Sequence, residues 1–175
     1  MNLFIRFAWL WLRLLVTKKP FTALNGAIHQ SYRILPHDMG WRLHLPNFRF
    51  FSFMELGRFE FWYVSHKFHE MSPGSRLIAA QELVYIRPVS PFALLHSDTV
   101  LLFWDDKYVY FQHNFYVKGT LVATGLAKEA CMRYGHVQSP VSIFGECQGS
   151  DVATAAAVEH WQALQQSLRQ LSQPK

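Results

Sequence analysis

The stretch that decides the fold runs from Asp38 to Arg58 and reads DMGWRLHLPNFRFFSFMELGR. A loop with a carboxylate, a histidine and an amide leads into a segment that would be apolar on nearly every side of a helix. A surface helix keeps a polar face, so this helix must be wrapped by other structure. The polar groups of the loop lie at the helix start, where backbone N–H groups lack intrahelical partners and can bind an anion or polarise a carbonyl.

Length and composition predict one globular domain. The chain has 175 residues, of which 50% are hydrophobic and 17% charged, which excludes a disordered protein. The net charge of +5 fits a phosphorylated ligand or an anionic membrane surface. Nucleic acid is not expected as a partner, because Lys and Arg are dispersed and no recognition module is visible. Cys131 and Cys147 lie far apart in sequence, which indicates reduced thiols in a cytoplasmic protein and no zinc or disulfide framework.

The first sixteen residues are almost entirely apolar, apart from Arg6 and Arg13. This run is shorter than the about 20 residues that span a bilayer, and it lacks a small-residue cleavage site. On a helix Arg6, Trp9 and Arg13 share one face, and the opposite face carries Phe4, Phe7, Trp11 and Leu14. Two interpretations stay open: a helix in a membrane interface, on the inner face, through residues 1–19, or a helix packed on the domain or on a second subunit.

Hydrophobic periodicity then divides the chain into an apolar and basic segment (1–30), a central domain (31–150) and a C-terminal helix (151–175). The pattern predicts a strand at 31–35, a loop at 36–46 and a long buried helix at about 48–68, with Asn47 as its N-cap. Strands are expected at 77–87, 100–104, 108–117 and 121–132, and a helix at 151–171. The expected fold class is α+β, with an antiparallel sheet curled around one long helix.

The opening stretch resembles the motif of hotdog-fold acyl-CoA thioesterases of the 4-hydroxybenzoyl-CoA thioesterase-like superfamily. That motif reads roughly Asp-x-Asp-x-x-x-His-Met-Asn-Asn-x-x-Tyr, followed by Glu-x-x-Arg. Here its first Asp, His, second Asn, aromatic residue, Glu and Arg correspond to Asp38, His44, Asn47, Phe50, Glu55 and Arg58. The second Asp of the motif, the usual catalytic carboxylate, falls on Gly40.

The resemblance extends over most of the chain from Tyr32 onward. The segment 104–107 (WDDK) and the strand after it look like the Trp-Asp turn and strand of the same branch, and 119–123 (GTLVA) matches its usual hairpin. The resemblance implies hydrolysis of acyl-CoA or acyl-carrier thioesters by a homodimer or tetramer, without a cofactor. The alternative is a catalytically impaired scaffold that binds acyl-CoA or lipid at a membrane surface.

Three residues are candidates for catalysis under this resemblance. Asp38 is the nearest substitute for the carboxylate missing at Gly40, and Glu55 is the second candidate, because other hotdog thioesterases place their carboxylate on the helix. His44 could bind the thioester oxygen or orient the carboxylate. The substrate-binding candidates are Asn47, Phe50 and Arg58.

Each candidate also has a structural interpretation. Asp38 could brace the loop through backbone N–H groups, and Glu55 could pair with Arg58 within the helix. The pair Asp38 and His44 also resembles the Asp-x4-His dyad of hotdog enoyl-CoA hydratases, but here five residues intervene. His66, His69 and Glu70 have a spacing compatible with a metal, yet a solvated helix end is the better interpretation, so no metal site is predicted.

Overall fold

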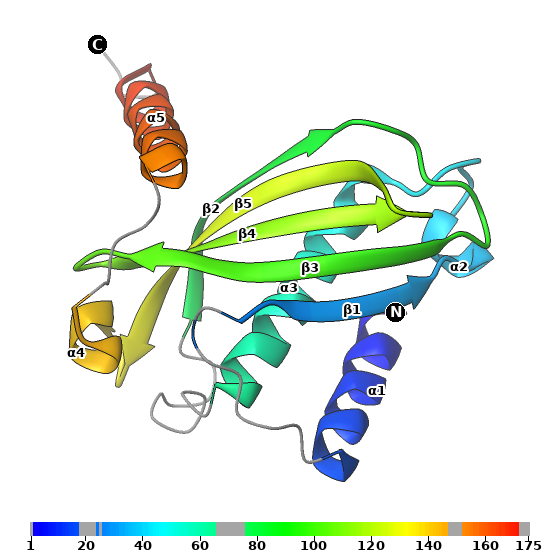
Figure 1. Ribbon diagram of the computed structural model, residues 1–175, viewed down its shortest axis with the longest axis horizontal. Helices are drawn as coiled ribbons and strands as arrows, with labels where there is room; N and C mark the ends of the chain where they lie inside the picture. The colour runs from blue at the N-terminus through cyan, green and yellow to red at the C-terminus, as the bar shows by residue number, and fades with distance from the viewer. Residues whose placement is uncertain (1, 18–23, 25, 66–75, 147–151, 172–175) are drawn as a thin grey trace.

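The computed structural model describes residues 2–17, 24, 26–65, 76–146 and 152–171. Within these residues the core is a six-stranded antiparallel sheet in the order β1-β3-β4-β5-β2, with β6 paired to β5 (Figure 1). The strands are β1 (Ile28–Arg33), β2 (Arg76–Tyr85), β3 (Leu94–Trp104), β4 (Tyr108–Val117), β5 (Thr120–Arg133) and β6 (His136–Gln138). The helices are α1 (Asn2–Val16), α2 (Pro36–Met39), α3 (Asn47–Val64), α4 (Pro140–Phe144) and α5 (Val152–Leu171).

The long helix α3 lies against the inner face of the sheet, where it contacts β1 and β3. Ten of its eighteen residues are buried, which explains why the segment is apolar on nearly every side. Alternate residues of β4 point at this helix, because successive side chains of a strand face opposite sides of a sheet. Phe111 packs edge-on against Phe61, and Phe115 packs edge-on against Phe50. Part of the aromatic surplus is therefore core; among the described residues nine aromatic side chains are buried and nine are exposed.

Strands and turns agree closely with the prediction. The strand at 108–117 is confirmed at both ends, and the other predicted strands are found with shifted ends. β3 begins at Leu94 and not at residue 100, because its first half pairs with β1, a long-range partner that periodicity does not reveal. The turn after β3 is held by the Asp105 carboxylate, which accepts hydrogen bonds from the backbone N–H groups of Lys107 and Tyr108.

The start of α3 differs from the prediction by one residue. Pro46 is the N-cap and Asn47 is already in the helix, with no side-chain cap hydrogen bond, so the prediction of Asn47 as N-cap is wrong. Pro46 has an extended backbone and cannot donate a hydrogen bond, which suits the residue just before a helix. Gly57 lies where a Cβ would overlap Oγ1 of Thr99 on β3, so the helix approaches the sheet too closely for a side chain.

The N-terminal helix α1 packs on α3 with its two arginines facing inward. Arg6 binds the Asp38 carboxylate at 2.5 Å, and Arg13 binds the Glu60 carboxylate. Both carboxylates are completely buried. Leu10 is buried beside the arginines, whereas Trp9 is 69% exposed. The arginine edge of this helix therefore faces the domain, and Trp9 lies outside that face.

The C-terminal helix α5 contacts the sheet through one small cluster, in which Val158 and Trp161 pack around Tyr110 of β4. Beside this cluster, Gln162 donates a hydrogen bond to the Tyr110 hydroxyl, and Gln165 accepts one from Lys128 Nζ at 2.6 Å. Ala155 and Ala156 and the three leucines of the last turns are exposed: Leu164, Leu168 and Leu171. Three short elements were not predicted, α2, α4 and β6, since each has five residues or fewer; α2 lies within the predicted loop at 36–46.

An antiparallel sheet that curls over one buried helix, with β1 paired to β3, defines the hotdog fold (Figure 1). The expected fold class is confirmed. No helix among the described residues is long and apolar enough to cross a bilayer.

Candidate functional site

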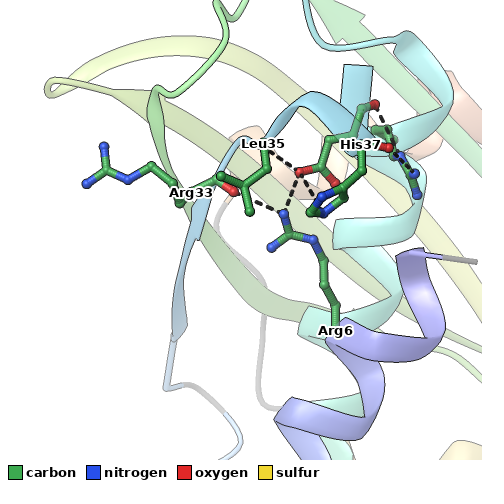
Figure 2. Close-up of polar contacts among 6 residues, drawn as sticks. Arg6, Arg33, Leu35 and His37 are labelled. Carbon is green, nitrogen blue, oxygen red and sulfur yellow. Dashed lines mark hydrogen bonds and ion pairs between the residues drawn. The ribbon is translucent and has the colours of Figure 1, made fainter. Parts of the chain in front are cut away.

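Asp38 lies in the short helix α2, at the loop that leads to α3. Its Oδ2 accepts a hydrogen bond from the Leu35 backbone N–H at 3.0 Å and from the Arg6 guanidinium at 2.5 Å, and His37 Nε2 lies 3.7 Å away (Figure 2). Arg49, in the first turn of α3, donates to the backbone carbonyls of His37 and Asp38 at 3.3 and 3.4 Å. These contacts fix a buried carboxylate beside the first turn of the long helix.

Gly40, the position of the usual family carboxylate, has a backbone that disfavours any side chain. Its φ is 61° and its ψ is −124°, a combination that residues with a Cβ rarely adopt. A Cβ would meet nothing within 4 Å, so space does not explain the glycine. In this loop conformation an aspartate at position 40 would have a strained backbone. Asp38 is therefore the carboxylate that remains in this loop.

Three other candidates line a cavity of about 240 Å³ next to the start of α3. His44 and Asn47 are exposed, and Phe50 is buried against Tyr85, whose hydroxyl donates to the Asn47 carbonyl at 3.2 Å. The first backbone N–H groups of an α-helix have no intrahelical acceptor, and no side chain caps them here. This cavity therefore combines an imidazole, an amide and a helix N-terminus.

Glu55 and Arg58 lie in a third place, a cavity of about 400 Å³ between α1, α3 and the sheet. Glu55 is exposed there, while Arg58 turns into the core and binds Glu129 of β5 at 2.5 Å. The alternative of an intrahelical pair between Glu55 and Arg58 is therefore wrong for the described residues. The cavity also contains Arg76, and its apolar wall includes Leu3, Phe4, Phe7, Phe59 and Ile78.

A buried polar network connects α3 to the sheet. The Glu129 carboxylate accepts from Arg58 Nε and from Trp62 Nε1, at 2.5 and 3.0 Å. An Arg58 nitrogen also lies 3.3 Å from Nε2 of His113, whose Nδ1 is 2.9 Å from Thr99 Oγ1. A guanidinium can only donate, so Nε2 must accept, and the His113 proton is on Nδ1. The network thus holds a neutral histidine in the core.

Burial, and then the neighbouring Arg58 charge, lower the pKa of His113 well below its usual 6.5. Thr99 and Phe111 also face the ring, and neither offers a negative charge to a protonated imidazole. In the unfolded chain His113 therefore takes up a proton near pH 6.5, whereas in the folded chain it takes one up only at a lower pH. The stability that depends on neutral His113 is fully present above pH 6.5 and is lost as the pH falls toward the pKa of this residue in the folded chain.

We expect the free energy of unfolding to fall by up to about 1.4 kcal/mol per pH unit below 6.5, because of His113 alone. Denaturant titrations at several pH values measure this slope. His113→Gln should flatten it, and His136→Gln, at an exposed position, should leave it unchanged. Equal slopes in wild type and His113→Gln would show that the buried histidine is not responsible.

The predicted site residues thus fall into three separate places in one chain. Sequence reasoning missed Glu129, His113 and Glu60, which are all buried. One signal was available for Glu129: it is the only charged residue in a series of small residues at alternate positions 123, 125, 127, 129 and 131 of β5. His66, His69 and Glu70 lie outside the described residues. Within the described part of the chain no group of three potential ligands could hold a metal ion.

Comparisons with known proteins agree with this fold. The model of the thioesterase-like superfamily matches residues 34–159, which is more than half of the chain. No curated protein matches the sequence significantly. Among solved structures, a thioesterase from Thermus thermophilus complexed with coenzyme A and Zn is 21% identical, with a TM-score of 0.58, over 66% of this chain and 87% of that one.

Two further structures have the same fold at lower identity. A predicted thioesterase from Bacillus stearothermophilus is 12% identical with a TM-score of 0.59, over 65% of this chain and 87% of its own. A probable thioesterase from Bartonella henselae is 16% identical with a TM-score of 0.57, over 65% of this chain and 98% of its own. The domain therefore has the hotdog fold. The chain belongs to the thioesterase-like superfamily.

Proposed function

We propose that this protein hydrolyses acyl-CoA thioesters and that Asp38 supplies the catalytic carboxylate. The observation that carries the proposal is the fixed position of this side chain. It is held by the Leu35 N–H and the Arg6 guanidinium, in a helix that Arg49 ties to the first turn of α3. The superfamily match supports thioester hydrolysis as the general class of reaction. The coenzyme A bound to the Thermus thioesterase supports CoA as the carrier.

The proposed reaction needs one base and one oxyanion site. The Asp38 carboxylate accepts a proton from water as the water oxygen bonds to the thioester carbon, and the carbonyl oxygen becomes an oxyanion. Backbone N–H groups at the start of α3, with His44 or Asn47 beside them, stabilise that charge. The C–S bond then breaks, and the proton passes to the leaving thiolate. The products are a carboxylic acid and the free thiol of CoA.

Glu55 is the second candidate for the base. It is exposed in the cavity of about 400 Å³, whose apolar wall suits an acyl chain and whose Arg76 guanidinium suits a developing negative charge. Phe50 is buried in the core, so its proposed contact with substrate is limited to the edge that faces the cavity beside His44.

One observation favours the alternative, a hotdog scaffold that binds acyl-CoA or lipid without turnover. The Asp38 carboxylate is completely buried and covered by Arg6, whose own side chain is 17% exposed. Water and a thioester reach this carboxylate only if Arg6 moves. If Arg6 stays in place, the carboxylate does no more than hold α1 on the domain.

A thiol-release assay separates the two functions. Purified full-length protein is offered a panel of straight-chain and aromatic acyl-CoAs, and binding of a non-hydrolysable acyl-CoA thioether is measured by calorimetry in parallel. The enzyme releases thiol in proportion to its concentration. Binding without thiol release would leave the scaffold as the function. Neither binding nor release would contradict both.

We further propose that the working form is a homodimer or tetramer. Hotdog thioesterases build their sites from two subunits, and the three separate groups of candidate residues here would then meet residues of a second copy. The sheet also has two edge strands, β1 and β2, which need a partner or a cover. A monomer in sedimentation velocity at micromolar concentration would contradict the shared site.

A further inference from the structure

Helix α1 has an unusual distribution of charge. Its only two charged residues, Arg6 and Arg13, both face the domain, where buried Asp38 and Glu60 hold them. These two ion pairs lie at opposite ends of the helix and fix its rotation about its own axis. The outward face is therefore entirely apolar, the reverse of what a helix exposed to water requires.

The outward face carries a continuous stripe at helical spacing: Ile5, Trp9, Leu12 and Val16. Their exposed fractions are 65, 69, 52 and 75%. Phe4 and Leu15 flank the stripe and are also more than half exposed. A contiguous apolar surface of this kind marks a contact with a partner or a membrane.

Basic side chains border this stripe. Ile5 and Trp9 help to line a cavity of about 640 Å³ between α1, β1 and α2, and Arg33, His37 and Arg49 are on its other walls. Figure 2 shows Arg33 and His37 on either side of Arg6. Arg33 and Arg49 donate to backbone carbonyls, and among the described residues neither forms an ion pair with a carboxylate. A guanidinium has five N–H donors, so both keep donors for an anion.

We propose that the outer face of α1 docks on a lipid bilayer that carries anionic headgroups. The apolar stripe enters the boundary between headgroups and acyl chains, and Arg33 and Arg49 lie beside lipid phosphates. Fifteen residues of helix are about 22 Å long, too short to cross a hydrocarbon core of about 30 Å but suited to lie in its surface. This surface contact is separate from thioester hydrolysis and does not depend on it.

A second copy of the chain fits this face less well. One helix face of about 22 Å by 10 Å offers roughly 220 Å² per copy, whereas stable interfaces bury about 800 Å² per partner. A two-fold arrangement across the stripe would also bring the cationic borders of both copies together. Binding to a bilayer combines the apolar area that enters it with attraction to anionic headgroups, and such headgroups complement these cations.

Vesicle co-sedimentation of the full chain tests the proposal. The vesicles contain either phosphatidylcholine alone or equal parts of phosphatidylcholine and phosphatidylglycerol. Wild type should bind the anionic vesicles more tightly than the zwitterionic ones. The double variant Leu12→Gln/Val16→Gln, which removes two apolar side chains without adding charge, should bind at least about ten-fold more weakly. Leu168→Gln, at a 55% exposed leucine of α5, is the matched control and should bind like wild type.

Arg33→Gln tests the electrostatic part and should reduce the preference for phosphatidylglycerol without changing binding to phosphatidylcholine. Val16→Gln alone, at the last residue of α1, replaces the double variant if that one loses its circular-dichroism spectrum. Wild type that sediments with neither vesicle, or stripe variants that bind like wild type, would overturn the proposal. So would a stripe variant that changes only the oligomeric state, because the face would then join two copies. Thiol release from a soluble acyl-CoA, without vesicles, reports separately on hydrolysis.

Discussion

Replacing Asp38 with asparagine is expected to lower acyl-CoA turnover by a factor of about 100 to 10,000, because an amide cannot accept a proton from water. Binding of the non-hydrolysable acyl-CoA should persist. The same substitution breaks the pair with Arg6, so we also expect a loss of about 1 to 3 kcal/mol in the free energy of unfolding. Rates must therefore be measured at a temperature where circular dichroism shows the variant to be folded.

Arg6→Gln is the matched control for this experiment. It breaks the same ion pair and leaves the carboxylate in place but buried without this cation, so it should cost at least as much stability and lower turnover less than Asp38→Asn does. Equal turnover in Asp38→Asn and wild type would mean that Asp38 only braces the loop. Loss of turnover in Glu55→Gln, with Asp38→Asn unaffected, would place the base on α3 in the cavity of about 400 Å³.

The second large effect is structural. Glu129→Gln should lower the free energy of unfolding by about 3 to 5 kcal/mol, because it leaves the Arg58 guanidinium buried without its carboxylate. Arg58 is 2% exposed and Glu129 5% exposed, so water cannot replace the lost partner. Urea denaturation measures the change, and Glu82→Gln, on the exposed side of β2, should cost less than about 0.5 kcal/mol. A loss below about 1 kcal/mol for Glu129→Gln would show that this pair adds little to stability.

The fold could be predicted from the sequence because its decisive signals are local. The segment after Pro46 is apolar on nearly every side over eighteen residues, and the strand at 108–117 has turn residues on both sides. The long-range polar contacts could not be predicted, because each joins residues far apart in sequence. The bond from the Leu35 N–H to Asp38 spans only three positions, and it agrees with the interpretation of Asp38 as a residue that braces the loop. Arg58 and Glu129 are separated by 71 positions, and only the curl of the sheet over α3 brings them together.

The same limit applies to the candidate site and to α1. The motif identified Asp38, His44, Asn47 and Glu55 as polar residues near a helix start, but spacing cannot tell which cavity each one lines. Amphipathic patterning places arginines toward water, and α1 does the opposite because its two partners are buried carboxylates 32 and 47 positions away. A prediction from the hydrophobic pattern of one helix cannot take account of partners that far away in the sequence.

The inward arginines of α1 also have an evolutionary consequence. The superfamily match begins at residue 34, whereas Arg6 and Arg13 precede it and neutralise two acids inside it. A lineage that lost this helix would remove the Arg13 guanidinium from buried Glu60, so selection should replace the acid at the same time. In an alignment of relatives, a glutamate at this position of the long helix should therefore be inherited together with an N-terminal extension that carries arginines seven residues apart.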